Sequence, residues 1–117
     1  MPEWSMPMNR RTRVSQSLID EIIRRVVEAA KPERIVLFGS AAAGKMTPDS
    51  DIDVLVLEAS PGNVRQESVR LWNALRGLGH PFDVVVMSTE RFEGTKNLVG
   101  GIAYPANRYG RVIYEAA

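Results

Sequence analysis

Three aspartates stand at the starts of two apolar runs in this sequence. Asp51 and Asp53 open the run at residues 51–57, and Asp83 is the second residue of the run at 82–87. Because side chains alternate along an extended strand, Asp51 and Asp53 are expected on one face, and Asp83 on the face opposite to Phe82. Adjacent carboxylates repel each other unless hard cations lie between them, and Mg²⁺ takes one or two carboxylates together with phosphate oxygens. Three acids on neighbouring strands could hold two such ions, which suits in-line displacement at phosphorus.

A turn suited to phosphate binding precedes the first two acids. The apolar run at residues 35–38 ends at Gly39-Ser40, as expected for a buried strand that enters a tight turn. Glycine lets a phosphate approach the backbone closely. If a helix begins at Ser40, the first backbone N–H groups and the Ser40 hydroxyl face an anion. The turn and the acids together predict a metal-dependent nucleotide site.

Alternating helical and strand-like segments must position these residues. Apolar residues at helical spacing predict a helix over 17–30 with Ser17 as its N-cap, and a second helix over 63–76. The apolar residues of the second helix, Val64, Leu71, Trp72 and Leu75, are expected to face the sheet. Strands are predicted at 35–38, 51–57, 82–87 and 112–114, with a short helical turn capped by Ser88 and a last helix over 97–104 ended by Pro105. These patterns do not determine the order of the strands.

The order and types of the site residues resemble a known signature, which runs Gly-Ser, a second glycine, Ser-Asp-x-Asp and a distant Asp. The matching positions are Gly39, Ser40, Gly44, Ser50, Asp51, Asp53 and Asp83. The chain resembles minimal nucleotidyltransferase domains of the DNA polymerase beta superfamily, of the type found as the antitoxin of HEPN/MNT pairs. The similarity extends from about residue 35 to residue 115. It implies an α+β (α/β two-layer) nucleotidyltransferase fold, with a small mixed sheet backed by helices.

The resemblance also implies roles for these residues. Asp51, Asp53 and Asp83 would bind two Mg²⁺ ions and form the catalytic site, while Gly39 and Ser40 would hold the triphosphate of ATP, with Gly44 and Ser50 beside them. The implied reaction transfers AMP from ATP to a hydroxyl, which in the HEPN/MNT pairs is a tyrosine of the toxin. Relatives often carry arginine between the two glycines, where this chain has alanines at 41–43. Lys45 is the nearest cation and would act as a point charge in its place.

Other interpretations of the same residues remain open. Gly39-Ser40 alone also fits an ordinary strand-to-helix turn, and Asp51 and Asp53 alone fit the solvent-facing edge of a strand. A nucleotidyltransferase fold without catalysis could neutralise a partner by occupying its surface. A transferase for small molecules is less favoured, because the chain has no room for an acceptor-binding domain. His80, the only histidine, is expected to be an exposed loop residue.

Length and composition set the remaining bounds. The chain has 117 residues, of which 44% are hydrophobic, so we expect one domain over residues 15–117, preceded by a flexible arm at residues 1–14. The net charge of +1 gives no polycationic surface, so a protein partner is expected as acceptor rather than nucleic acid. No cysteine is present, and no apolar stretch approaches the roughly 20 residues of a membrane span. A cytoplasmic protein is therefore expected.

Overall fold

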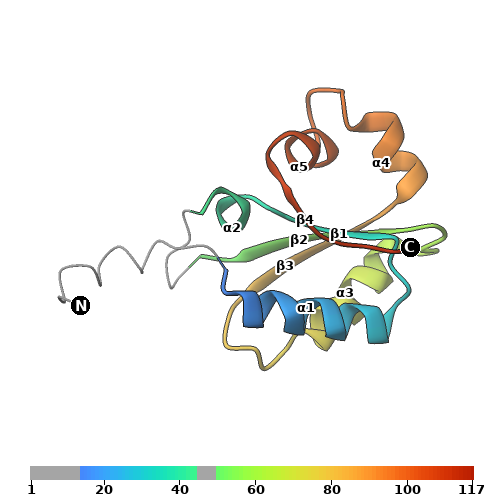
Figure 1. Cartoon of the computed structure of the whole chain (residues 1–117). Coiled ribbons are helices and arrows are strands. Elements are labelled where there is room, and N and C mark those ends of the chain that lie inside the picture. Colours follow the sequence, from blue (N-terminus) through green and yellow to red (C-terminus); the bar gives the residue numbers. More distant parts are fainter. Residues whose placement is uncertain (1–13, 45–49) are drawn as a thin grey trace, which may run out of the picture.

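The computed structural model describes residues 14–44 and 50–117, which form one mixed four-stranded sheet with helices on both faces (Figure 1). The elements follow in the order α1 (Gln16–Ala29), β1 (Arg34–Phe38), α2 (Ser40–Ala43), β2 (Ile52–Glu58), α3 (Val64–Ala74), β3 (Phe82–Ser88), α4 (Thr89–Thr95), α5 (Ala103–Tyr109) and β4 (Arg111–Glu115). The strand order is β3-β2-β1-β4. β1 is antiparallel to β2 and β4, whereas β2 and β3 are parallel. The predicted mixed sheet backed by helices is confirmed.

Two separate apolar clusters cover the two faces of the sheet. On one face, α1 and α3 bury Ile52, Val54 and Val56 of β2. On the other face, Leu55 and Leu57 pack with Phe92 of α4 and with α5. β2 is therefore buried almost continuously, as expected for a strand that is covered on both sides. Asp53 lies on the same face as Leu55 and Leu57, at the start of this strand, and the other polar residue of the strand, Glu58, ends it.

The N-cap of the first helix lies two residues earlier than its apolar pattern predicts. Ser15, and not Ser17, is the N-cap, and its side chain accepts a hydrogen bond from the backbone N–H of Leu18. Val14 precedes this cap and is buried in the same cluster as Ile19, four residues after the cap. Such an apolar pair across an N-cap fixes where the helix starts. The predicted cap at Ser88 is confirmed, because its side chain accepts from the N–H of Arg91.

The prediction for the last helix is wrong, since Pro105 lies inside α5 and does not end a helix. α5 begins after Ile102, so Pro105 is its third residue. The N–H groups of the first helical turn have no partner within the helix, and proline is tolerated there because it lacks one. Gly100 and Gly101 have φ of 111° and 69°, which no helix through this segment could accommodate. The helix therefore starts after these glycines.

One face of α3 was also predicted incorrectly. Leu71 and Leu75 are buried as expected, but Val64 and Trp72 are 44% and 45% exposed. α3 packs against β3, and β3 is the edge strand. Because the sheet ends there, it cannot cover the side of α3 that carries Trp72.

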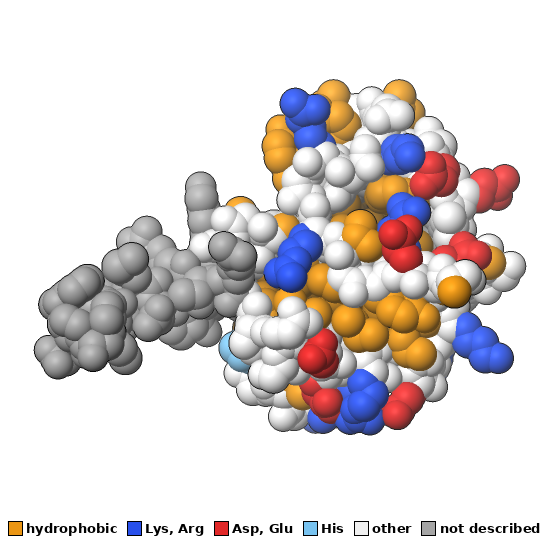
Figure 2. All heavy atoms as spheres, in the orientation of Figure 1, with side chains coloured by type: hydrophobic (Ala, Val, Ile, Leu, Met, Phe, Trp, Pro, Cys, Tyr) orange, Lys and Arg blue, Asp and Glu red, His pale blue; other side chains and the backbone are white. Residues whose placement is uncertain are grey.

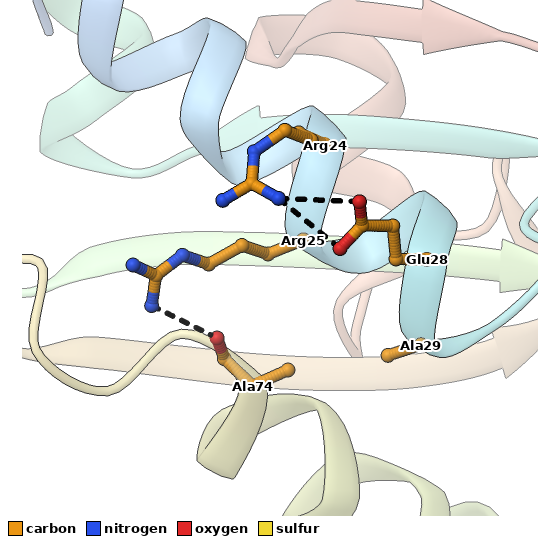
Figure 3. Close-up of a pocket in the computed structure, with 5 residues that line it drawn as sticks. All are labelled: Arg24, Arg25, Glu28, Ala29 and Ala74. Atoms are coloured by element: carbon orange, nitrogen blue, oxygen red, sulfur yellow. Dashed lines mark hydrogen bonds and ion pairs between the residues drawn. The ribbon is translucent and has the colours of Figure 1, made fainter.

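Arginines from α1 and α3 hold the C-terminal end of each other's helix. Arg25 of α1 donates to the carbonyl oxygens of Ala74 and Arg76, at 3.2 and 2.8 Å, and Arg70 of α3 donates to the carbonyl of Ala29. Figure 3 shows the difference between Arg25, which reaches across to Ala74, and Arg24, which pairs with Glu28 on its own helix. The last carbonyl groups of a helix have no N–H donor within the helix, so these hydrogen bonds stabilise both helix ends. The two helices are thereby joined at both ends of their contact.

The surface shows no continuous basic region on the face in Figure 2, where Lys and Arg side chains alternate with Asp and Glu. This mixture agrees with the balanced net charge of the sequence. No helix of the described residues is long and apolar enough to cross a membrane.

Candidate active site

The predicted site residues meet at one end of the sheet. β1 runs antiparallel to β2, so the end of β1 lies beside the start of β2, and the start of the parallel strand β3 lies beside it as well (Figure 1). The register pairs Phe38 with Asp53, and Asp53 with Asp83. Gly39 follows Phe38 directly. Residues from three separate segments are thus brought together by strand pairing alone.

The three acids interact electrostatically. The pKa of Asp53 is raised, first because its carboxyl group is partly buried, and then because the charges of Asp83 and Asp51 lie nearby. A side-chain hydrogen bond with Asp83 raises it further. Burial and like charges both disfavour the ionised form of an acid. Asp51 and Asp83 are exposed at the mouth of the site, while Asp53 lies further in.

Gly39 allows the Asp53 carboxylate to lie against the backbone of the turn. Its φ is 66°, in the left-handed region, and a Cβ at this position would lie 2.2 Å from Oδ2 of Asp53. Any side chain here would displace that carboxylate. The second glycine, Gly44, ends α2 with a φ of 70°, and its N–H bonds to the carbonyl of Ser40. A helix does begin at Ser40, and the two glycines of the signature lie directly before and after it.

The other predicted residues are placed less fully. Ser40 is the first residue of α2 and is half-buried, and Ser50, also half-buried, directly precedes Asp51. Lys45, the predicted point charge, lies outside the described residues.

The acids fit a hard divalent cation by their chemistry, although their three carboxylates do not converge on one point. Within residues 14–44 and 50–117, no group of three or more His, Cys, Asp or Glu side chains is arranged to hold a metal ion. The donor set of Asp51, Asp53 and Asp83 is nevertheless all oxygen, which Mg²⁺ prefers. Burial is the first cause of the raised Asp53 pKa, and the repulsion from Asp83 and Asp51 that adds to it is the interaction that a bound cation would relieve.

Sequence reasoning missed one part of this end of the sheet. Trp72, predicted to face the sheet, is exposed and lines two hollows beside Asp51 and Asp83. His80 is exposed as predicted, and it lines one of these hollows together with Arg76. A signal was present in the sequence, because Trp72 and Arg76 are four residues apart and so fall on the same side of a helical turn.

Comparison with known proteins gives the family. The chain matches the nucleotidyltransferase domain family over residues 19–103. No curated protein matches the sequence.

Three solved structures share the fold. A mutant of the toxin–antitoxin MntA-HpeT is 21% identical with a TM-score of 0.62, over 84% of this chain and 73% of that one. A tri-AMPylated Shewanella oneidensis HEPN toxin in complex with MNT antitoxin is 22% identical with a TM-score of 0.58, over 86% of this chain and 72% of that one. A toxin–antitoxin with AMP-PNP is 23% identical with a TM-score of 0.57, over 84% of this chain and 73% of that one. These structures share the fold of this chain, and the family match over residues 19–103 shows that this chain belongs to the nucleotidyltransferase domain family.

Proposed function

We propose that this chain is a Mg²⁺-dependent adenylyltransferase that moves AMP from ATP to a tyrosine hydroxyl of a partner protein, a HEPN-type toxin that it neutralises. The observation that carries the proposal is the placement of Asp53 between Gly39 and Asp83 at the end of the sheet. Structures of similar fold support the choice of acceptor and nucleotide, since one contains a tri-AMPylated HEPN toxin with an MNT antitoxin and another contains AMP-PNP.

In the proposed reaction, the acceptor oxygen forms a bond to the α-phosphorus of ATP. The bond between that phosphorus and the α–β bridging oxygen breaks, and pyrophosphate leaves with the electron pair. The hydroxyl proton passes to the carboxylate of Asp83 and then to solvent, since Asp83 is exposed and lies beside Asp53. Gly39 and Ser40 hold the triphosphate at the turn, where the glycine leaves the backbone open.

Magnesium, when bound by Asp51, Asp53 and Asp83, supplies positive charge that stabilises the negative charge on the reacting phosphate and on pyrophosphate. The chain itself provides the carboxylates at one end of a rigid sheet. Partial burial of Asp53 strengthens its interactions with any charge at the site, because less water surrounds it than surrounds an exposed carboxylate.

Label transfer from α-labelled ATP tests the proposal. The wild-type chain with Mg²⁺ is expected to label one protein in a lysate of its native host, and Asp53→Asn is expected to label none. Asp20→Asn is the matched control, because Asp20 is an exposed aspartate on α1, away from the acids. Asp53→Asn should fold at least as well as the wild type, since it removes a repelled carboxylate. Labelling that survives in Asp53→Asn would refute the proposed catalytic role.

A second candidate is a nucleotidyltransferase fold that neutralises its partner by binding alone. The observation that favours it is the run of alanines at 41–43, where relatives often carry an arginine for the triphosphate. Toxicity assays with Asp53→Asn separate the two candidates. If the variant loses transfer but still protects cells from the toxin, binding is sufficient; if it loses both, protection requires the reaction.

A further inference from the structure

Two adjoining hollows lie between α3 and the edge strand β3, next to the acidic end of the sheet. One, of about 260 Å³, is lined by Ser68, Val69, Trp72, Phe82, Asp83 and Val84. The other, of about 240 Å³, is lined by Trp72, Leu75, Arg76, His80, Pro81 and Phe82 together with Asp51. Because Trp72 and Phe82 belong to both, the two hollows form one surface feature, which we call the Trp72 groove.

The groove combines exposed aromatic surface with a positive charge. Trp72 is 45% exposed, and the guanidinium carbon of Arg76 lies 5.7 Å from the centre of its ring. Arg76 forms no ion pair with any carboxylate of the described residues, and its guanidinium group lies over the Trp72 ring. Large aromatic side chains that are exposed beside an arginine are typical of protein-binding hot spots.

The groove is also open along a strand. β3 pairs only with β2 among the described strands, so its other edge presents unpaired backbone groups. An edge strand with side-chain pockets beside it is a common site for an extended peptide, which adds backbone hydrogen bonds to the strand.

We propose that the Trp72 groove binds the acceptor: a segment of the partner protein lies along β3, and its tyrosine ring packs against Trp72 and Phe82. This inference rests on the proposed function and deepens it by assigning the site of the acceptor. Asp51 and Asp83 are among the residues that line the groove, so a ring held there lies next to the acidic end of the sheet. The rest of the segment extends over Val69, which is 55% exposed.

Steady-state kinetics of AMP transfer test the assignment, with the partner that the labelling experiment identifies as the purified acceptor. We expect Trp72→Ala to raise the KM for the partner by about tenfold, with the KM for ATP unchanged, and Trp72→Phe to restore most of the loss. Tyr109→Ala is the matched control, because Tyr109 is an exposed aromatic with Arg108 at the same 5.7 Å, but on α5. A raised KM for ATP would show instead that the groove binds the adenine base. Unchanged constants for both substrates would show that it binds neither.

A measurement without catalysis separates failure of this inference from failure of the proposed function. The indole N–H signal of Trp72 is followed in ¹⁵N-labelled protein, with Trp4→Phe to assign the two tryptophans. N-acetyl-tyrosinamide is expected to shift this signal in a saturable way, and N-acetyl-alaninamide is not. If the wild type labels no protein, the proposed function fails, yet this titration still decides whether the groove accepts a tyrosine. An equal response to both compounds, no response to either, or an equal response to ATP overturns the assignment.

Discussion

A buried carboxyl group far from the acids at 51–53 makes the stability of this protein depend on pH. Glu58, the last residue of β2, is 8% exposed, and its Oε2 has no hydrogen-bond partner. Burial, followed by a hydrogen bond and the charge of Glu67, raises the pKa of Glu58 to about 7. Glu67 itself binds Arg70, which lowers the pKa of Glu67. Glu58 is therefore about half-protonated near pH 7, and its protonated carboxyl group donates a hydrogen bond to Glu67.

The sign and size of the effect follow from this difference. In the unfolded chain, Glu58 titrates near 4.5, so between about pH 4.5 and pH 7 the folded state holds more protons and its stability falls as pH rises. At about 1.4 kcal/mol for each pKa unit, the full shift corresponds to roughly 3 kcal/mol. The pKa of Glu67 is lowered, so its contribution changes only below about pH 4.5 and does not alter this interval. Part of this loss already occurs below about pH 5, so we expect a loss of about 2 kcal/mol between about pH 5 and pH 8.

The substitution Glu58→Gln isolates this effect, because glutamine keeps the volume and a hydrogen-bond donor but cannot ionise. Urea denaturation at intervals from about pH 5 to pH 8 measures the free energy of unfolding. The wild type should lose about 2 kcal/mol across this range relative to Glu58→Gln, which should then be the more stable protein at pH 8. Glu28→Gln, an exposed glutamate on α1, serves as control and should follow the wild type. A Glu58→Gln curve parallel to that of the wild type would refute this account of Glu58.

Two further substitutions test the contacts that hold the site and the helices. Gly39→Ala should lower the free energy of unfolding by about 2–3 kcal/mol, since its Cβ would meet Asp53. Gly62→Ala, with a similar φ of 67° and open space around it, should show only the backbone cost of about 1 kcal/mol. Equal losses in chemical denaturation would show that the contact with Asp53 costs nothing. Arg25→Met should lose about 1–2 kcal/mol in the same assay, since it leaves the end of α3 without two hydrogen bonds. Arg24→Met, which removes pairs within α1 only, should change little, and equal effects of the two would contradict the role given to Arg25.

The site could be predicted from the sequence because its residues stand where apolar runs begin and end. The run before Gly39 and the run after Asp53 are both strands, and alternation places Asp83 on the face opposite to Phe82. Each of these inferences uses only neighbours along the chain. The pairing that brings Asp83 beside Asp53 came from family resemblance, because the order of strands depends on contacts between distant segments.

The features that were predicted wrongly are those decided by tertiary contacts. Ser15 and Ser17 are equally good caps, and burial of Val14 selects Ser15. Trp72 has the large apolar side chain of a core residue, but it is exposed because the sheet ends at β3. Pro105 ends a helix only when it falls beyond the first turn, and Gly100 and Gly101 place it within that turn. None of these outcomes can be read from spacing alone.

The parallel register of β2 and β3 links correct folding to a correctly formed site. Seven residue pairs, from Ile52 with Phe82 to Glu58 with Ser88, hold this register. A slip of one residue would turn Asp83 toward the apolar cluster under α3 and move Val84 and Val86, which belong to that cluster, to the opposite face. Such a chain would bury a charge and lose apolar contacts, so it would not compete with the native pairing. Almost every molecule that folds therefore has its acids side by side, and the same apolar residues that stabilise the sheet act as a check on the geometry of the site.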